Sequence, residues 1–165
     1  MILKGRAWKF GDNLSTDDII PGRFYHLRSN LEELKRHVFA DIAPGFSTKV
    51  AKGDIVVGGR NFGQGSSREH APLIIKLAGI DAIVASSFAR IFYRNAINVG
   101  LAAIICGGED VGEGDALEVN LDEGLLIDRT KGLEKRFPPL PTIMRSILDE
   151  GGLDRYVKKH GGLVL

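Results

Sequence analysis

Between residues 54 and 106 the sequence alternates short apolar segments with longer amphipathic ones, and glycines stand at the joints. Three segments are short, mainly apolar and typical of buried strands: 54–57, 80–86 and 101–106. The two segments between them, 69–79 and 87–100, have apolar residues at helical spacing and a glycine at the C-terminal end. Buried strands that alternate with helices form parallel sheets. This order therefore predicts an α/β core.

The segments around this core follow other patterns. Residues 2–10 predict a strand, and residues 30–40 predict a helix whose N-cap is Asn30. Residues 113–130 have the pattern of a β-hairpin, and RFPPLP is a stiff, extended connector. The sequence then predicts one last amphipathic helix within residues 140–162, followed by a frayed tail.

Length and composition restrict the class of protein. A chain of 165 residues fits one domain, 1–165, that is long enough to bury a core. Its net charge of +1 gives no electrostatic reason to expect nucleic acid or an anionic membrane as partner. No apolar run reaches the roughly 18 residues of a membrane span, and the N-terminal residues lack the apolar stretch of a signal peptide. We therefore expect a cytoplasmic protein.

The chain has a single cysteine, Cys106. One thiol cannot form an internal disulfide, and it cannot hold an iron–sulfur cluster or a thiolate zinc site with residues of this chain. Because Cys106 ends a predicted buried strand, we interpret it as a small core residue.

The stretch GSSREHA, residues 65–71, places two hydroxyls, a guanidinium, a carboxylate and an imidazole before a predicted helix. It lacks the lysine of a P-loop, the second glycine of a serine-hydrolase elbow and the glycine spacing of a Rossmann fingerprint. One explanation is purely structural: a serine caps the helix, and the glutamate in its first turn favours the helix dipole.

The other explanation is chemical. A helix N-terminus offers free N–H groups and partial positive charge, and Arg68 adds a planar fork that suits a carboxylate. A serine held there has a stabilised alkoxide and can act as a base. These residue types therefore indicate a site where a polycarboxylate loses a proton from carbon.

Three blocks of sequence resemble one known family in order and spacing: WKFGDNLSTDDIIPG, GDIVVGGRNFGQGSSREHAP and SFARIFYRNAINVGL. Over essentially its whole length the chain resembles the small subunits of the aconitase-superfamily hydro-lyases, most closely those of 3-isopropylmalate dehydratase and homoaconitase. The resemblance implies a swivelling β/β/α domain, like the C-terminal domain of aconitase, that closes over a large partner subunit. It also implies that the partner carries a [4Fe–4S] cluster, that this chain binds no cofactor, and that the substrate is a small di- or tricarboxylate.

The resemblance assigns roles to individual residues. The first serine of GSSRE is the family's base, which carries over to Ser66. The following serine and arginine bind a substrate carboxylate or steady the alkoxide, which carries over to Ser67 and Arg68. The family's catalytic aspartate corresponds to Asp17, and Thr16 beside it is a candidate for substrate binding.

Residues 22–34, after the DIIPG block, are expected to select the substrate. An arginine in this segment binds a third carboxylate in homoaconitases, and HLRS is similar to their pattern, which favours Arg28 as a carboxylate ligand. A buried guanidinium that faced an isopropyl group would be unpaired and unfavourable. Phe24 and Tyr25 depart from that pattern; they could instead wall an apolar pocket and turn Arg28 outward.

We therefore expect a subunit that interconverts 2- and 3-isopropylmalate in leucine biosynthesis, active only with a large subunit. A homoaconitase or dual-substrate subunit is the alternative. A non-catalytic polycarboxylate-binding module is an alternative of another class, although the intact GSSRE stretch argues against it. Arg90 and Arg94 share a helix face, and we interpret them and Asn95 as structural residues.

Overall fold

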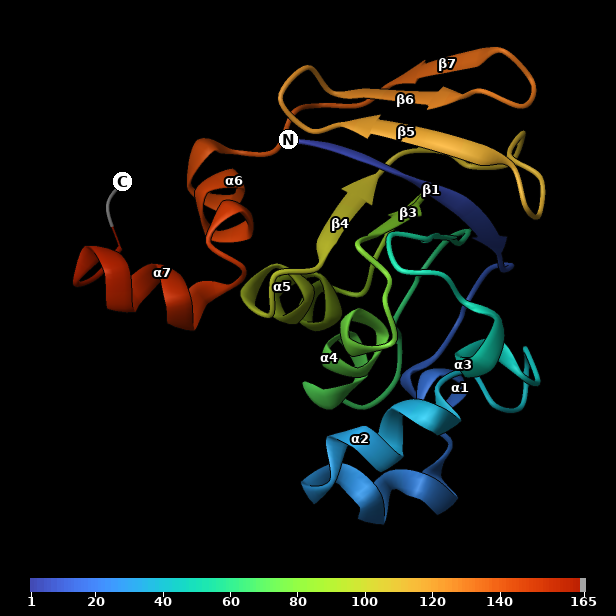
Figure 1. The fold of residues 1–165 in the computed structure, drawn as a ribbon, viewed down its shortest axis with the longest axis vertical. Helices are drawn as coiled ribbons and strands as arrows, with labels where there is room; N and C mark the ends of the chain where they lie inside the picture. Colours follow the sequence, from blue (N-terminus) through green and yellow to red (C-terminus); the bar gives the residue numbers. More distant parts are fainter. Residues whose placement is uncertain (164–165) are drawn as a thin grey trace.

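The computed structural model describes residues 1–163, and seven strands form one curled sheet in it (Figure 1). The strand order is β4-β3-β2-β1-β5-β6-β7. The strands are β1 (Ile2–Lys9), β2 (Ile55–Val57), β3 (Ala82–Ala85), β4 (Ala102–Ile105), β5 (Ala116–Asn120), β6 (Leu125–Asp128) and β7 (Leu133–Arg136). β1 to β4 pair in parallel, whereas β5 to β7 continue the sheet from β1 with antiparallel pairs. β1 therefore joins a parallel half of the sheet to an antiparallel half.

The helical segments are short. They are α1 (Thr16–Ile19), the 3-10 helix η1 (Gly22–Ser29), α2 (Leu31–Leu34), the 3-10 helix η2 (Lys35–His37), α3 (Phe46–Lys49), α4 (His70–Leu77), α5 (Arg90–Asn98), α6 (Thr142–Asp149) and α7 (Leu153–His160). α4 and α5 pack on each other beside the parallel strands, and α6 and α7 lie against α5 (Figure 1).

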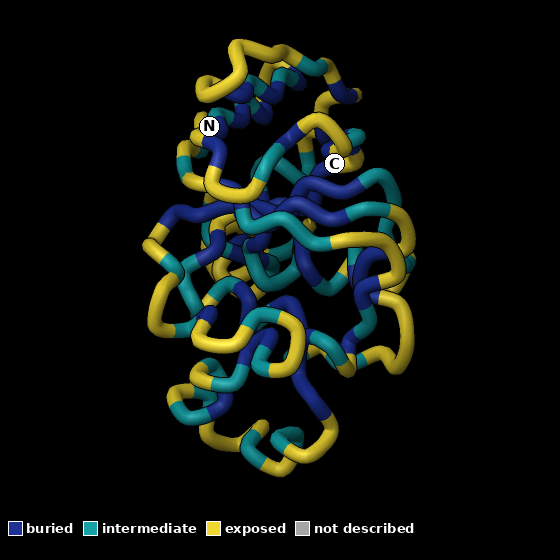
Figure 2. Tube along the Cα trace, turned by 90° about the vertical axis from the view of Figure 1, so that its right-hand side faces the viewer, coloured by how far each residue is buried: buried dark blue, intermediate teal, exposed yellow. Residues whose placement is uncertain are grey.

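The parallel half follows the order that the sequence predicts: β2, α4, β3, α5 and β4 succeed one another along the chain. β2 and β3 are buried at every residue, and buried residues run through the middle of the molecule while exposed ones follow its outer loops (Figure 2). Because protein covers both faces of these strands, they have no polar face. The predicted α/β core is confirmed.

The helix predicted over residues 30–40 is broken into two short pieces. Asn30 is the N-cap, as predicted, because its side-chain oxygen accepts a hydrogen bond from the Glu33 N–H at 3.2 Å. The α-helical part ends at Leu34, however, and a 3-10 turn continues only to His37. Side-chain periodicity predicted the buried face correctly but not the change of helix type.

The C-terminal third contains one strand more and one helix more than predicted. Two adjacent glycines with positive φ, Gly151 (86°) and Gly152 (131°), divide the helix predicted within 140–162 into α6 and α7. β7 was not predicted, because its residues LEKR are mostly exposed at the sheet edge and lack apolar alternation. Residues 164–165, the end of the predicted domain and of its frayed tail, lie outside the described residues.

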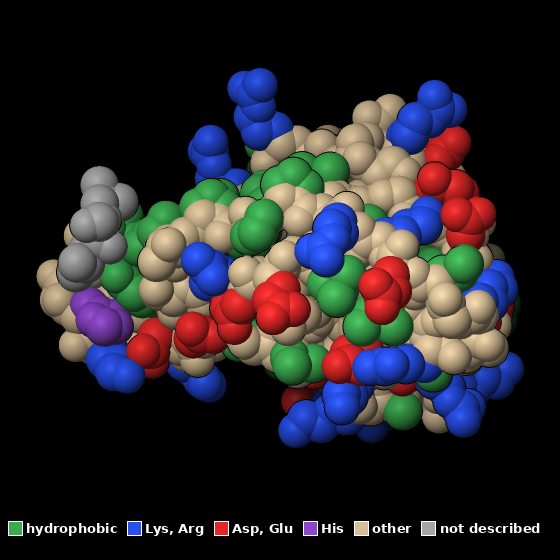
Figure 3. All heavy atoms as spheres, turned by 90° about the horizontal axis from the view of Figure 1, so that it is seen from above, with side chains coloured by type: hydrophobic (Ala, Val, Ile, Leu, Met, Phe, Trp, Pro, Cys, Tyr) green, Lys and Arg blue, Asp and Glu red, His purple; other side chains and the backbone are tan. Residues whose placement is uncertain are grey.

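Charges of both signs are interspersed over the surface seen in Figure 3, with apolar side chains scattered between them. This distribution agrees with the net charge of +1. Within residues 1–163, no helix is long and apolar enough to cross a membrane.

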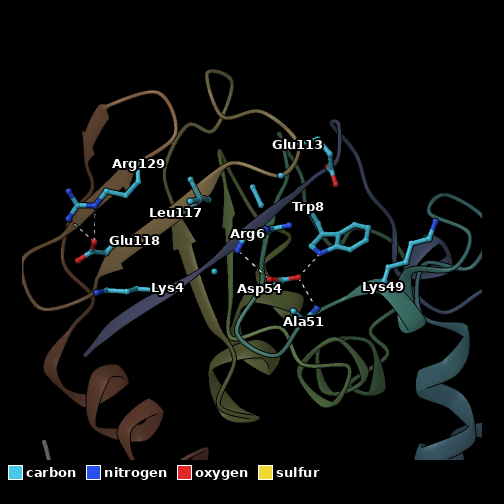
Figure 4. Close-up of a pocket in the computed structure, with 14 residues that line it drawn as sticks. Lys4, Arg6, Trp8, Lys49, Ala51, Asp54, Glu113, Leu117, Glu118 and Arg129 are labelled. Carbon is cyan, nitrogen blue, oxygen red and sulfur yellow. Dashed lines mark hydrogen bonds and ion pairs between the residues drawn. The ribbon is translucent and has the colours of Figure 1, made fainter.

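A buried carboxylate, that of Asp54, ties the start of β2 to β1 (Figure 4). It accepts hydrogen bonds from the backbone N–H of Arg6 (3.2 Å), the indole N–H of Trp8 (3.0 Å) and the backbone N–H of Ala51 (2.9 Å). Three donors on two chain segments therefore depend on one side chain.

Asp54→Ala should leave these donors without their acceptor. Since a hydrogen bond to a charged group contributes about 1.5–3 kcal/mol, we expect the free energy of unfolding to fall by about 2–4 kcal/mol. Urea denaturation measures this change. Asp149→Ala, at the exposed end of α6, is the matched control and should stay within about 0.5 kcal/mol of the unsubstituted chain. An equal loss in both variants would contradict this role of Asp54.

A second buried carboxyl, that of Asp128 at the end of β6, has a pKa that is affected by the carboxyl of Asp115. Asp128 is 2% exposed, and its Oδ2 has no donor, although Oδ1 accepts the Lys131 N–H at 3.1 Å. Two carboxyl groups can pair only if one is protonated. Burial, and then the contact with Asp115, raises the pKa of Asp128, whereas the hydrogen bond from Asp128 lowers the pKa of Asp115. As the pH falls, Asp128 is therefore the first of the two carboxyls to take up a proton.

Asp128→Asn should stabilise the chain at neutral and higher pH. A carboxyl whose pKa is raised by folding contributes stability below its unfolded pKa, and this contribution is lost as the pH rises through the folded pKa. Asparagine has nearly the same shape and can still accept the Lys131 N–H, but it does not titrate. Urea denaturation at several pH values should give a variant that is more stable at pH 8, with a difference that shrinks toward about pH 4. A difference independent of pH would contradict the raised pKa of Asp128.

Candidate functional site

A pocket of about 210 Å³ lies where the loop after β2 meets α1 and the first turn of α5. It is lined by Thr16, by Gly63 and residues 65–68 of the loop, and by residues 89–92 and Asn95 of α5. The structure thus brings four predicted site residues to one pocket: Thr16, Ser66, Ser67 and Arg68.

The capping of α1 decides how its side chains face this pocket. The Ser15 hydroxyl accepts the Asp18 N–H at 3.0 Å, and the Asp18 carboxylate accepts the Ser15 N–H at 2.8 Å. The Thr16 N–H donates to the carbonyl oxygen of Gln64 at 2.8 Å, which fastens α1 to the loop. Thr16 is therefore buried at the pocket, whereas the side chain of Asp17 is 71% exposed.

Two hydroxyl groups meet inside the pocket, since the Oγ of Ser66 lies 3.5 Å from the Oγ1 of Thr16. Gly65, directly before Ser66, has a φ of 106°, a backbone conformation that favours glycine. A Cβ at this position would also come within 3.1 Å of the Thr16 hydroxyl oxygen. Glycine is therefore needed both for the turn of the loop and for the space beside the two hydroxyls.

The two serines do not cap a helix. α4 begins at His70, its N-cap is Glu69, and no side chain of the loop caps it. Ser66 and Ser67 lie before the helix and are exposed. The serine cap on which the structural explanation relied is therefore absent, and that explanation of the serine pair fails.

Positive charge reaches the pocket from the N-terminus of α5. The N-cap of α5 is Ala89, whose side chain cannot accept a hydrogen bond, so no side chain satisfies the free N–H groups of the first turn. The first-turn residues 90–92 form part of the pocket wall. Their partial positive charge favours an anionic ligand, as does the guanidinium of Arg68.

Arg68 is half-buried and held from three sides. Its Nη1 donates to the carbonyl oxygen of Ile20 at 2.9 Å and lies 3.7 Å from Oδ1 of Asp17. Its guanidinium carbon lies over the ring of Tyr25, 4.7 Å from the centroid. Since a guanidinium has five N–H donors, this arrangement leaves donors for a carboxylate in the pocket.

Arg28 is not among the residues that line the pocket. Its Nη1 donates to the carbonyl oxygen of Tyr25 at 3.2 Å, and its guanidinium lies 5.0 Å from the centroid of the same ring. The side chain is exposed. The structure therefore turns Arg28 back onto its own 3-10 helix and does not bring it to the serines.

Two pocket residues were interpreted from the sequence as structural. Arg90 and Asn95 both line the pocket. Helical spacing could have indicated Asn95, since it follows Ile91 by four residues on the helix that begins at the pocket. The contact of Tyr25 with Arg68 was also missed, and no pattern in the sequence pairs these two residues.

A larger cavity, of about 570 Å³, lies on β1 and β5 around Arg6 and Trp8 (Figure 4). None of the predicted site residues lines it. Over residues 1–163 there is also no group of three or more His, Cys, Asp or Glu side chains placed to hold a metal ion. The pocket at Ser66 is therefore the site to which the sequence motifs and the geometry both point.

Known proteins share both the sequence and the fold. The aconitase C-terminal domain family matches residues 25–109. A protein named 3-isopropylmalate dehydratase small subunit 2, from Archaeoglobus fulgidus, is 59% identical over 99% of both chains. The isopropylmalate/citramalate isomerase small subunit of Methanocaldococcus jannaschii is 55% identical over 96% of this chain and 95% of its own.

A solved structure supports the same assignment. The crystal structure of 3-isopropylmalate dehydratase (leuD) from Methanocaldococcus jannaschii superposes with a TM-score of 0.92 at 46% identity, covering 98% of this chain and 96% of that one. The resemblance inferred from the sequence blocks and the predicted fold class are thereby confirmed. The chain belongs to the family of 3-isopropylmalate dehydratase small subunits, which has the fold of the aconitase C-terminal domain.

Proposed function

We propose that this chain is the small subunit of a heteromeric iron–sulfur hydro-lyase that interconverts 2- and 3-isopropylmalate in leucine biosynthesis. The whole chain, 1–165, acts as one swivelling domain that closes over a large subunit, in the cytoplasm. The observation that carries the proposal is the pocket where Ser66 and Arg68 meet Thr16 and the N-terminus of α5.

In this proposal Ser66 is the base. Dehydration removes a proton from one carbon atom and hydroxide from its neighbour, which together make up one water molecule, and a C=C bond forms between the two carbons. Addition of water with the opposite regiochemistry then gives the isomer. An alkoxide forms only where positive charge stabilises it, and Arg68 and the first turn of α5 supply that charge. Ser67, Thr16 and Arg68 bind the substrate. Asp17 acts through Arg68, whose guanidinium it approaches at 3.7 Å.

The residues of this chain do not fit an iron–sulfur cluster. The single thiol, Cys106, is buried at the end of β4, and burial raises its pKa, which disfavours the thiolate that iron requires. We therefore assign the [4Fe–4S] cluster to the large partner subunit. When bound there, it supplies a Lewis acid for the leaving hydroxyl.

Replacing the base should abolish turnover while binding persists. In the complex reconstituted with its large subunit, Ser66→Ala should lower kcat by about 10²- to 10⁴-fold, with little change in KM. Steady-state hydration of isopropylmaleate measures both constants. Ser146→Ala, on α6, is the matched control and should keep full activity. A Ser66→Ala enzyme within fivefold of the unsubstituted rate would exclude Ser66 as the base.

A second candidate is a subunit that accepts two substrates. The Methanocaldococcus jannaschii relative is named for both isopropylmalate and citramalate, which share two carboxylates and differ in an apolar group. A third carboxylate, as in homoaconitate, would need a partner such as Arg28, and Arg28 does not line the pocket. The geometry therefore favours dicarboxylates.

Competition between unsaturated acids tests whether the complex prefers dicarboxylates to tricarboxylates. We expect the reconstituted complex to hydrate isopropylmaleate and to leave cis-homoaconitate unreacted. A complex that accepts two substrates should also hydrate citraconate. Arg28→Val should then change kcat/KM for isopropylmaleate by less than about threefold, because an exposed side chain outside the pocket contributes little. Turnover of cis-homoaconitate that Arg28→Val abolishes would establish the homoaconitase alternative. Millimolar or tighter dicarboxylate binding by the isolated chain, without turnover in the complex, would favour the non-catalytic module.

A further inference from the structure

The ring of Tyr25 contacts two arginines, Arg68 of the GSSRE stretch and Arg28 of the HLRS stretch. The Arg68 guanidinium lies 4.7 Å and that of Arg28 lies 5.0 Å from the ring centroid. A cation within about 6 Å of an aromatic face is attracted by the ring quadrupole. Tyr25 is absent from the pocket lining, so it contacts the site only through Arg68.

Two elements fix the position of this ring. Tyr25 belongs to η1, and the Arg28 guanidinium closes a turn of that helix by donating to the Tyr25 carbonyl oxygen at 3.2 Å. From the other side, His70 packs edge-on against the ring, with centroids 6.0 Å apart and an interplanar angle of 83°. His70 is the first residue of α4. The ring is therefore held between the segment after α1 and the helix that follows the serine loop.

Without the ring, Arg68 is poorly restrained. Its hydrogen bond to Ile20 uses one N–H group, and its only ion-pair partner among the described residues is Asp17, at 3.7 Å and with a 71% exposed side chain. An exposed ion pair contributes little to the position of a long side chain. The third contact of Arg68 is the aromatic face of Tyr25, over which the guanidinium carbon lies 4.7 Å from the ring centroid.

We propose that Tyr25 is a positioning residue that holds the Arg68 guanidinium in the orientation in which it binds a substrate carboxylate. The inference rests on the proposed function, because it assigns the carboxylate to Arg68. It also gives the histidine of GSSREHA a role, which is to back the ring on which Arg68 rests. A guanidinium that is already held in place loses less conformational entropy when it binds a carboxylate. Removal of the ring should therefore weaken substrate binding more than it slows the chemical step.

The chain offers a matched control for the aromatic substitution. Phe24 is the neighbouring residue of η1 and also carries a cation, since the Arg23 guanidinium lies 4.4 Å from its centroid. Arg23, however, pairs with Asp41 on the surface at 2.8 Å, and neither lines the pocket. Phe24 itself does not line the pocket, and it also stacks on His37 with centroids 4.0 Å apart. Phe24→Leu therefore removes an aromatic face under an arginine at a place where no effect on the site is expected.

The first measurement needs no substrate. In the full chain labelled with ¹⁵N-arginine, the Nε–Hε resonance of Arg68, assigned by its loss in Arg68→Lys, should be shifted upfield by the ring current. Tyr25→Leu should abolish the shift, Tyr25→Phe should keep it, and Phe24→Leu should leave it unchanged. An unshifted Arg68 resonance, or one that Tyr25→Leu does not move, would overturn the inference whatever reaction the complex catalyses.

The second measurement is a double-mutant cycle in the reconstituted complex. Tyr25→Leu should lower kcat/KM for isopropylmaleate by about 3- to 30-fold, mainly through KM, and Tyr25→Phe should restore it. In an Arg68→Lys background Tyr25→Leu should have no further effect, because the two residues act as one unit. Additive losses, or an unchanged KM, would show that Tyr25 does not act through Arg68. Absence of turnover in the unsubstituted complex would instead overturn the proposed reaction, and the ring-current measurement alone would then decide the role of Tyr25.

Discussion

The site depends on the parallel pairing of two chain segments that continues beyond the named strands. β1 and β2 pair in register, and hydrogen bonds between the segments that follow them carry the pairing onward: Asn13 N–H to Arg60 carbonyl (2.7 Å), Gly63 N–H to Leu14 carbonyl (2.7 Å) and Thr16 N–H to Gln64 carbonyl (2.8 Å). The last bond is made by Thr16 itself, and its acceptor Gln64 stands two residues before Ser66. Because each bond fixes the register of the next, the hydroxyls of Thr16 and Ser66 meet although 50 residues separate them in the chain.

Two glycines of the second segment lie against side chains that leave no room for a Cβ. A Cβ on Gly59 would lie 1.9 Å from the Asp12 carboxylate, and one on Gly63 would lie 2.2 Å from the ring of Phe92. A larger residue at either position would displace a neighbouring side chain. Gly59 and Gly63 of the GGRNFGQG stretch therefore leave room for the side chains packed against the loop, and Gly63, with a φ of 84°, also favours glycine by its backbone conformation.

How far the sequence predicted the fold depended on the kind of signal. The parallel core was predictable because apolar strands and Gly-ended helices leave separate local patterns, whereas β7 was not, since LEKR at a sheet edge has no apolar face. For the site, GSSRE identified the loop, and the family resemblance pointed to Thr16 and Asp17, although the helix α1 that carries them was not predicted. The contact of Tyr25 with Arg68 was not predictable, because it joins a 3-10 helix to a loop through side chains alone.

The exposure of the site bears on what the chain can do by itself. Ser66 and Ser67 are exposed, and beside them Ile91, on the first turn of α5, has 54% of its surface open to solvent. Water around a serine hydroxyl screens the charges that would stabilise its alkoxide, so a base in this position needs a second surface that excludes water. An apolar side chain at the pocket rim gains free energy when such a surface covers it. Under the proposed function, the exposure that would make the pocket a poor active site in isolation is thus the feature that favours its closure against a large subunit.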